Sequence, residues 1–194
     1  LLITGGLGNL GSWIVEEAVK DFDVTVLTKS FREVLVDGSY ELIIADLSDE
    51  QQLKDKLRNK DFQYIIHAGS ANDSSVTDYP QLSYKVNTFG TRNLIQALDF
   101  KNVRHFIYLS TFHVYGLSSG LINEETNTNP NNDYAMSHLF AEYFISMGLQ
   151  DLKYSIVRLT NSYGCPKDLN SSKWYLILND LSKSAFYKKE IILN

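Results

Sequence analysis

The stretch Thr4-Gly5-Gly6-Leu7-Gly8-Asn9-Leu10-Gly11 decides the fold of this chain. It joins a short apolar run to an amphipathic segment, so it predicts a strand, a tight turn and a helix. Gly5 permits the turn, Gly8 lets a ligand approach the backbone, and Gly11 lets the helix pack closely on the strand. The free N–H groups at the start of the helix, those of Asn9 and Leu10 among them, favour an anionic ligand. The stretch therefore predicts a diphosphate-binding turn.

The rest of the chain continues the alternation of apolar strands and amphipathic helices. We expect strands at Leu1–Thr4, Val24–Thr28, Glu41–Ala45, Tyr64–His67, His105–Leu109 and Tyr154–Leu159, and a possible one at Glu190–Asn194. Helices are expected at Leu10–Lys20, Asp49–Arg58, Gln81–Leu98, Asp133–Met147 and Ser171–Lys183, and residues 48–51 predict a capping box for the second. Several strands are continuous apolar runs, which is typical of parallel strands covered on both faces. The pattern predicts an α/β fold, a doubly wound parallel sheet (Rossmann fold) in three α/β/α layers.

Composition limits the classes of partner and site. The 194 residues suit one well-buried domain or one domain with a small extension, and the net charge of −5 gives no footprint for nucleic acid or an anionic membrane. The only cysteine is Cys165, so we expect no disulfide within the chain and no metal site built on thiolates. No apolar run approaches the roughly 20 residues that span a bilayer. We expect a cytoplasmic protein with neither a membrane nor a nucleic-acid partner.

The chain opens on half a strand without an initiator Met, and its last predicted helix is followed by little more sequence. We therefore expect that residues 1–194 form one domain cut at both ends, and the resemblance of its motifs to a known family implies that this is a dinucleotide-binding domain whose C-terminal substrate domain is missing.

Several motifs between Thr4 and Gly164 resemble the extended short-chain dehydrogenase/reductase family, the epimerases and dehydratases of nucleotide-linked sugars. They are the glycine turn, the pair Asp46-Leu47, the segment His67-Ala68-Gly69 and a helix carrying Asn87. The resemblance implies that Asp46 and Leu47 hold the adenine ring and that residues 67–69 pass beneath the cofactor, with Gly69 in place of the family's Ala. Asn87 would have a structural and proton-relay role, and His67 a structural one.

The end of the second strand bears on the choice between NAD and NADP. A carboxylate there would bond the adenosine ribose and repel a 2′-phosphate. Thr28 stands there instead, and the cations Lys29 and Arg32 follow it. These residues favour NADP slightly over NAD.

Two further segments resemble the reactive centre of the family. Thr111, four residues before Tyr115-Gly116, matches the position that binds substrate, and Tyr134 matches the tyrosine of a Tyr-x-x-x-Lys signature. Residues i and i+4 share a helix face, so Tyr134 and His138 are expected to face one cleft. His138 replaces the lysine, and a histidine with an ordinary pKa near 6.5 is mostly neutral at pH 7. Either the enzyme is slow or pH-sensitive, or another group such as His113 compensates, or the protein binds without turnover.

The substrate reaction is narrowed by the residues after Thr111. Phe112-His113 replaces the Asp-Glu pair of the sugar 4,6-dehydratases, which disfavours dehydration. Asn161 lies in a segment similar to the family's Arg-x-x-Asn-x-Tyr-Gly, whose Asn contacts the sugar nucleotide. Three hypotheses follow: a sugar-nucleotide epimerase or 4-keto reductase, a non-catalytic dinucleotide-binding sensor or scaffold, and a reductase of a non-sugar ketone or alcohol. We also expect a homodimer.

Overall fold

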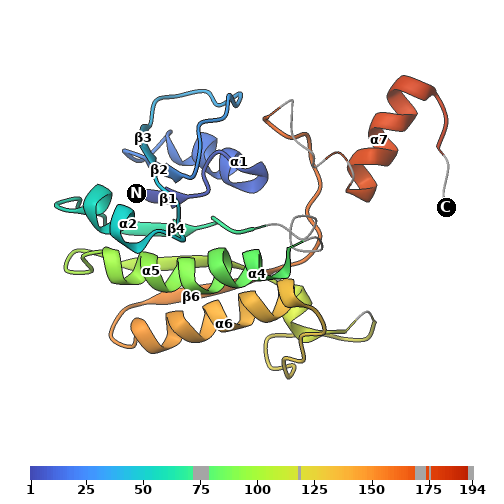
Figure 1. The fold of residues 1–194 in the computed structure, drawn as a ribbon. Helices are drawn as coiled ribbons and strands as arrows, with labels where there is room; N and C mark the ends of the chain where they lie inside the picture. Colours follow the sequence, from blue (N-terminus) through green and yellow to red (C-terminus); the bar gives the residue numbers. More distant parts are fainter. Residues whose placement is uncertain (72–78, 118, 169–173, 175, 192–194) are drawn as a thin grey trace.

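The computed structural model describes residues 1–71, 79–117, 119–168, 174 and 176–191, and its centre is a six-stranded sheet (Figure 1). The strands are β1 (Leu2–Thr4), β2 (Thr25–Thr28), β3 (Glu41–Ile44), β4 (Tyr64–His67), β5 (His105–Thr111) and β6 (Tyr154–Leu159). All neighbours pair in parallel, in the order β3-β2-β1-β4-β5-β6. The predicted doubly wound parallel sheet is confirmed.

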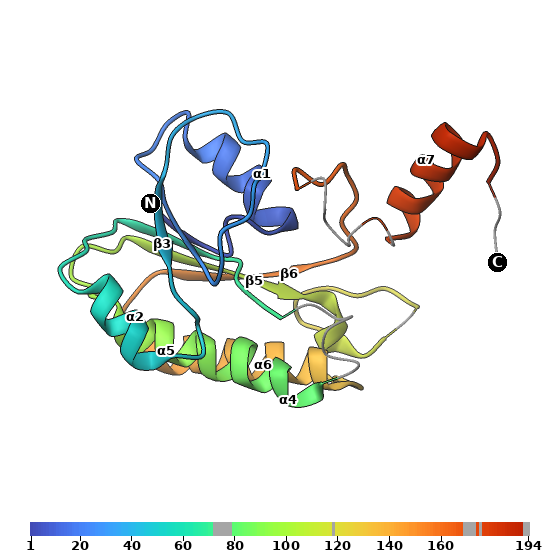
Figure 2. The same ribbon diagram turned by 45° about the horizontal axis from the view of Figure 1, so that its top comes forward.

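Helices cover both faces of the sheet (Figures 1 and 2). Helix α1 (Asn9–Ala18) lies on one face, and α2 (Glu50–Leu57), α5 (Gly90–Ala97), α6 (Asp133–Gly148) and the short α4 (Pro80–Ser83) lie on the other. Helix α7 (Ile177–Lys188) stands away from the sheet in both views. Two helical layers around one sheet confirm the expected three-layer arrangement.

The order of the strands reverses between β1 and β4, which are paired with Thr4 opposite His67. In open α/β sheets, ligands bind outside the carboxyl ends of the strands at such a switch point. The carboxyl end of β5, at Thr111, lies on the same edge because the strands are parallel. This edge is where the predicted site residues should meet.

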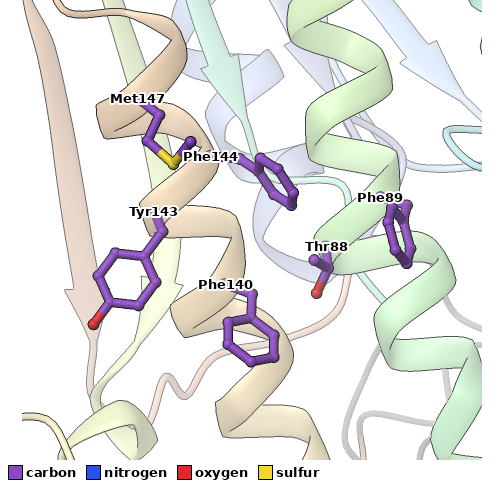
Figure 3. Close-up of a pocket in the computed structure, with 6 residues that line it drawn as sticks. All are labelled: Thr88, Phe89, Phe140, Tyr143, Phe144 and Met147. Carbon is purple, nitrogen blue, oxygen red and sulfur yellow. The ribbon is translucent and has the colours of Figure 1, made fainter.

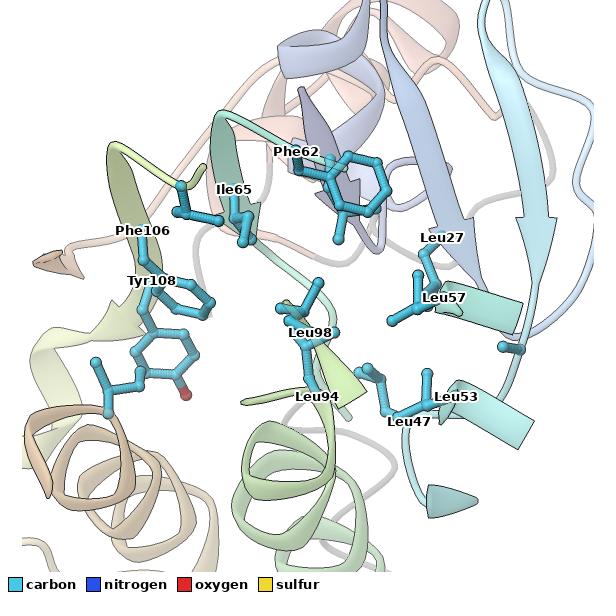
Figure 4. Packing of buried hydrophobic residues seen from close by; sticks show 14 of the residues in the cluster. Leu27, Leu47, Leu53, Leu57, Phe62, Ile65, Leu94, Leu98, Phe106 and Tyr108 are labelled. Atoms are coloured by element: carbon cyan, nitrogen blue, oxygen red, sulfur yellow. The ribbon is translucent and has the colours of Figure 1, made fainter. Parts of the chain in front are cut away.

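The larger of the two main apolar clusters fills the space between the sheet and helices α2, α5 and α6 (Figure 4). It joins Leu2 and Ile65 of the central strands to Leu53 and Leu94 of the helices, and all four side chains have no exposed surface. Tyr108 of β5 belongs to it although it carries a hydroxyl. The carboxyl ends of the strands thus rest on a closely packed core, which holds them in place.

The helix expected at Gln81–Leu98 is divided into three parts. Between α4 and α5 the chain forms a π-helical turn, η1 (Tyr84–Phe89). Its neighbouring residues Asn87 and Thr88 are both buried, and both hydrogen-bond to Ser137 of α6. Tertiary contacts therefore override the local α-helical pattern, as is frequent for π turns near functional sites.

The start of α2 corrects the predicted capping box. The N-cap of α2 is Asp49, not Ser48, and its side chain accepts a hydrogen bond from the Gln52 N–H. Ser48 is not available as a cap because its hydroxyl donates to the Asp46 carboxylate.

Near the C-terminus, the helix expected at Ser171–Lys183 is found as α7, which begins six residues later and ends five residues later, and part of the expected range lies outside the described residues. Glu190 and Ile191 are not in a strand, and residues 192–194 of that prediction also lie outside the described part.

Candidate functional site

The glycine turn connects β1 to α1 with little space for side chains. Gly5 has φ +67, and a Cβ placed on it would lie 2.6 Å from the Cα of Gly69, in the segment after β4. A Cβ on Gly11 would overlap the carbonyl oxygen of Gly5. The Gly8 N–H donates to that same oxygen at 2.8 Å. These close approaches explain the glycine at each position.

Helix α1 begins without a side-chain cap. Its N-cap is Gly8, and no side chain of the described residues caps the first turn. Asn9 is partly exposed and Leu10 is exposed at this end of the helix. Uncapped N–H groups at an accessible helix start form an anion site. The turn thus fits the diphosphate of a dinucleotide.

Asp46 follows β3 at the same edge of the sheet and is held as a carboxylate. Its Oδ1 accepts hydrogen bonds from the N–H and the hydroxyl of Ser48, and Lys29 Nζ lies 2.9 Å from its Oδ2. Partial burial opposes the charged form, but the hydrogen bonds from Lys29 and Ser48 outweigh it and hold the pKa of Asp46 below its ordinary value. Leu47 beside it is buried.

Both cations predicted for a 2′-phosphate have carboxylate partners. Lys29 contacts Asp46, and Arg32 Nη1 lies 4.0 Å from Asp168 Oδ2 in the segment after β6. Thr28 ends β2 and donates to the Ser30 carbonyl oxygen. The three residues lie at one end of the sheet edge, beside the expected adenine-binding pair.

His67 joins the glycine turn to α5. Its Nδ1 lies 2.6 Å from Thr4 Oγ1, and its Nε2 lies 2.9 Å from Thr91 Oγ1. The Thr91 hydroxyl donates to the Asn87 carbonyl oxygen, so it accepts from His67 Nε2–H. Thr4 accepts from the Gly69 N–H and donates to Nδ1, which completes a neutral imidazole with two partners. Burial and the nearby His138 lower the pKa of His67 to about 3, in agreement with this protonation.

Gly69, which stands in place of the family's Ala, lies in a crowded position. A Cβ there would lie 2.9 Å from Leu47 Cδ1 and 3.1 Å from Thr4 Oγ1. The adjoining Ala68 donates its N–H to the Thr4 carbonyl oxygen. The departure at residue 69 therefore leaves space for Leu47 and for the Thr4 hydroxyl.

Asn87 fastens the chain after β4 to α6. Its Oδ1 accepts from the Ala71 N–H at 2.6 Å, and its Nδ2 donates to Ser137 Oγ at 3.0 Å. The Ser137 hydroxyl in turn donates to the Tyr134 carbonyl oxygen. Asn87 is thus one hydrogen-bonded residue away from the backbone of Tyr134.

The expected reactive residues gather where β5 ends and α6 begins. The ring centroids of Tyr134 and His138 are 4.7 Å apart, and the ring of His113 lies 6.1 Å from that of Tyr134. Thr111 is the last residue of β5, and its Oγ1 accepts from the His113 N–H at 3.3 Å. Residues from the end of β5 and from the start of α6 thus lie in one cluster.

His138 is only 2% exposed and is hydrogen-bonded on one side alone. Its Nδ1 lies 2.7 Å from the hydroxyl oxygen of Tyr108, whereas its Nε2 has no hydrogen-bond partner within the described part of the chain. Burial, with a smaller effect from His113, lowers the pKa of His138 to about 4. His138 is therefore neutral at pH 7.

Sequence reasoning missed two residues that hold this region. The sequence places Tyr108 in an apolar strand, although a tyrosine buried in a strand needs a partner for its hydroxyl. Glu142 of α6 forms a two-point ion pair with Arg158 of β6, at 2.8 and 3.1 Å, and accepts from the Ser110 hydroxyl at 2.6 Å. A glutamate in an apolar helix was the available signal, since buried charges are paired.

Asn161 lies two residues beyond the end of β6 in an exposed position. The segment that follows it packs on α1: the Trp13 indole donates to the Cys165 carbonyl oxygen at 3.0 Å, and Lys167 Nζ lies 4.0 Å from the centre of the Trp13 ring. The segment after β6 thus returns to the helix that starts at the glycine turn.

A separate hollow of about 260 Å³ lies on the outer side of the helical layer (Figure 3). It is lined by Thr88, Phe89, Phe140, Tyr143, Phe144 and Met147. Most of these side chains come from α6 and are apolar.

No helix among the described residues has the length and apolar composition needed to cross a bilayer.

Comparison with known proteins agrees with this geometry. Residues 1–193 match the model of the NAD dependent epimerase/dehydratase family. The UDP-glucose 4-epimerase of Lactobacillus helveticus is 30% identical over 176 residues, which cover 87% of this chain and 53% of that protein. The human dTDP-D-glucose 4,6-dehydratase is 28% identical over 180 residues, covering 84% and 50%. The chain spans about half the length of these relatives.

A solved structure shows the same fold. The Thermus thermophilus UDP-glucose 4-epimerase, in complex with NAD, is 26% identical with a TM-score of 0.74, covering 88% of this chain and 58% of that one. The family model covers nearly every residue of the chain. The chain belongs to the NAD dependent epimerase/dehydratase family, the extended short-chain dehydrogenases/reductases.

Proposed function

We propose that this protein is an NAD(P)-dependent enzyme that oxidises and reduces the sugar of a nucleotide-diphospho-sugar, as an epimerase or a 4-keto reductase. One observation carries the proposal: an uncapped helix start and the Tyr134–His138 pair both belong to the carboxyl edge of one parallel sheet. The first feature fits a diphosphate and the second fits proton transfer to or from a carbinol. Residues 1–194 would form the dinucleotide-binding domain of this enzyme.

The residues available to hold the dinucleotide follow the sheet edge. The turn Gly5–Gly11, with the N–H groups of Asn9 and Leu10, would bind the diphosphate, and Asp46 with Leu47 would bind the adenine. The segment His67–Gly69 and Asn87 would lie beneath the nicotinamide half. When bound, the cofactor supplies a reversible hydride acceptor.

The remaining residues would manage the proton of the substrate. Tyr134 would take the proton from the sugar hydroxyl as hydride leaves, and it would return the proton in the reverse direction. Thr111 would hydrogen-bond the same hydroxyl from the end of β5. His138 would stand in the lysine's place as a hydrogen-bond donor that carries no charge, which predicts a slower reaction than with lysine.

The NADP preference is part of the proposal. Its support is the absence of a carboxylate at Thr28 and the two cations Lys29 and Arg32 near the adenine pair. A 2′-phosphate would have to compete with Asp46 and Asp168 for these cations, so we expect a modest preference. The T. thermophilus relative was solved with NAD.

The choice of substrate reaction follows from two residues. Phe112 and His113 stand where the dehydratases carry Asp and Glu, so we propose epimerisation or ketone reduction and not loss of water. Asn161, after β6, would contact the sugar nucleotide. A reductase of a non-sugar ketone is the alternative.

A direct test incubates the full-length protein with NADPH or NADH and a panel of nucleotide-diphospho-4-keto-sugars. Oxidation of the reduced cofactor with one sugar nucleotide, and none with simple ketones, is the expected result. Oxidation with simple ketones alone would favour the non-sugar reductase, and the appearance of a dehydrated product would overturn our exclusion of dehydration.

A second candidate function, dinucleotide binding without turnover, is favoured by the neutral state of His138. The variant His138→Lys separates the two functions. We expect the lysine to raise kcat at pH 7 by about tenfold or more, because a cation favours the phenolate. A protein that binds dinucleotide and remains silent in both forms would establish pure binding.

We further propose that the protein is a homodimer that pairs through the hollow on α6. Helix α6 carries apolar residues on its buried face and also on its outer face, where Tyr143 is 52% and Met147 is 68% exposed. A helix that is apolar all round is usually covered. Analytical ultracentrifugation should show a dimer that Met147→Glu dissociates. The matched control Leu121→Glu, in a loop residue that is 96% exposed, should remain dimeric.

A cytoplasmic location is proposed from the single cysteine in the chain and from the cofactor. Fractionation of cells that express the full-length protein would test it.

A further inference from the structure

One polar atom in the described part of the chain is buried without a hydrogen-bond partner, and it is His138 Nε2. The side chain around it is almost entirely buried, so water does not solvate it freely. A buried donor or acceptor without a partner costs about 1–3 kcal/mol. Such an atom in a folded protein needs an explanation, and a bound group that completes the hydrogen bond is one.

The protonation of the other nitrogen of His138, Nδ1, determines whether Nε2 offers a ligand a hydrogen-bond donor or an acceptor. Tyr108 Oη lies 2.7 Å from His138 Nδ1 and has no second hydrogen-bond partner among the described residues. Burial, with Glu142 and Tyr134 nearby, raises the pKa of Tyr108 well above its ordinary value, so the phenol keeps its proton. Tyr108 is therefore able to donate to Nδ1.

The two tautomers of His138 differ in how many groups they leave unpaired. If Nδ1 carried the proton, the Tyr108 O–H and the Nε2 lone pair would both be buried without partners. If Tyr108 donates to Nδ1, only one group, Nε2–H, lacks a partner. The second arrangement leaves fewer unsatisfied groups and is favoured.

Neighbouring aromatic rings hold the orientation of the His138 ring. Tyr108 stacks on two imidazoles, with ring centroids 5.3 Å from His67 and 5.9 Å from His138. The Tyr134 ring meets His138 edge-on at 4.7 Å. The groups that face His138 are thus Tyr108 from β5, Tyr134 from α6 and His113 from η2 (Phe112–Tyr115), with His67 of β4 behind Tyr108. None of these groups is a lysine or an arginine, so no permanently charged cation faces His138 from them.

We propose that Tyr108 is a positioning residue: by donating to Nδ1 it holds His138 in the tautomer that presents Nε2–H, as a neutral donor, to a ribose hydroxyl oxygen of the bound dinucleotide. The inference rests on the proposed function, because it takes the cofactor as the ligand. A lysine at this position would bring its own donors and charge and would not need a tyrosine behind it. A histidine has two tautomers, and Tyr108 selects one of them.

The tautomer is measured directly by ¹⁵N NMR of the histidine side chains in the full-length protein at neutral pH. We expect His138 to have a protonated Nε2 and an unprotonated, hydrogen-bonded Nδ1, and we expect the Nε2 resonance to shift when NADPH is added. In Tyr108→Phe, which keeps the ring and loses the hydroxyl, His138 should become a mixture of tautomers. The control Tyr154→Phe, at the opposite end of the sheet, should leave the His138 resonances unchanged.

Binding measurements then test the coupling. Tyr108→Phe should raise the Kd for NADPH about fivefold, the worth of one hydrogen bond. His138→Gln should bind nearly as well as the native protein, because its amide oxygen accepts from Tyr108 and its NH2 donates to the ribose. In His138→Lys, adding Tyr108→Phe should leave the Kd unchanged.

Three results would overturn the inference: a protonated Nδ1, an imidazolium at neutral pH, or a Tyr108→Phe variant with native tautomer and affinity. If no dinucleotide binds at all, the proposed function fails, and the NMR of the native protein and of Tyr108→Phe still decides whether Tyr108 sets the tautomer.

Discussion

Two buried histidines, His67 and His138, both stack on Tyr108 and have different hydrogen bonding. His67 has a partner for each nitrogen, Thr4 and Thr91. Within the described part of the chain, His138 has a partner for Nδ1 alone. Both are neutral, because burial lowers the pKa of each well below 6.5. Residue type, burial and charge are the same, so the hydrogen-bond count distinguishes them.

The difference separates a structural role from a ligand-binding one. A side chain with every hydrogen bond completed inside the protein has no hydrogen bond to offer a ligand, so the His67 imidazole ties the glycine turn to α5, and it can meet the dinucleotide only through packing. A side chain left with one buried donor is stabilised when a ligand arrives. The comparison therefore predicts that changes at His67 lower stability and changes near His138 lower function.

The largest effect is expected at Tyr134, the neighbour of His138. Tyr134→Phe should lower kcat about 10³-fold, because it removes the proton-transferring group. The Kd for the dinucleotide should change by less than about threefold, since the ring is retained. Steady-state kinetics and calorimetry measure the two values. A fall in kcat of under about tenfold would mean that another group transfers the proton.

A paired substitution examines the two histidines themselves. His67→Leu removes two buried hydrogen bonds and should lower the free energy of unfolding by about 3 kcal/mol, whereas His138→Leu removes one and should lower it by about 1 kcal/mol. Urea unfolding of both variants measures the difference. The affinity for NADPH should change in the opposite order, with the greater loss in His138→Leu. Equal stability losses would remove the distinction on which this comparison depends.

Both histidines should affect the pH dependence of the free energy of unfolding in the same direction. The unfolded chain takes up a proton on each histidine below about pH 6.5, whereas folded His138 resists until about 4 and folded His67 until about 3. Stability is therefore full above pH 6.5 and falls as the pH drops below it, by about 1.4 kcal/mol per pH unit for each histidine. Urea unfolding between pH 7 and pH 5 should show a smaller slope in His138→Leu. An unchanged slope would show that His138 is charged in the folded protein.

The smallest effect is expected at the adenine end, away from both histidines. Lys29→Ala should reduce the preference for NADPH over NADH about fivefold, since it removes one exposed cation from the 2′-phosphate. Lys54→Ala, on the outer side of α2, is the matched control and should change neither Kd. A preference that persists in Lys29→Ala would place the 2′-phosphate elsewhere.

The sequence was sufficient for the sheet because the strands are short, largely apolar runs, several of them continuous, that alternate with amphipathic helices. The predicted strands agree with β1 to β6 within two residues at their ends. The π turn at Tyr84–Phe89 was not predictable in the same way, because the contacts of Asn87 and Thr88 with Ser137 cross 50 and 49 positions of the chain. A local helical pattern does not contain such contacts.

Motifs in the sequence suffice to propose candidate site residues, as at Gly8, Asp46 and Tyr134, and these assignments remain predictions. The pairing of Tyr108 with His138 was not predictable, because it joins a strand to a helix across 30 positions. The exchange of lysine for histidine was visible in the sequence, but its charge state depends on burial, which only the fold reveals. The carboxylate partners of Lys29 and Arg32 were missed for the same reason.

The most direct test of the central claim, that the glycine turn binds a nicotinamide dinucleotide without a cationic side chain, is a calorimetric titration of the full-length protein with NADPH and NADH. Binding in the micromolar range is the expected result, and it should weaken at least about tenfold in Gly8→Ala, whose new methyl group would stand where the diphosphate approaches the backbone. No heat of binding from either dinucleotide at millimolar concentration, or equal binding by Gly8→Ala, would contradict the account.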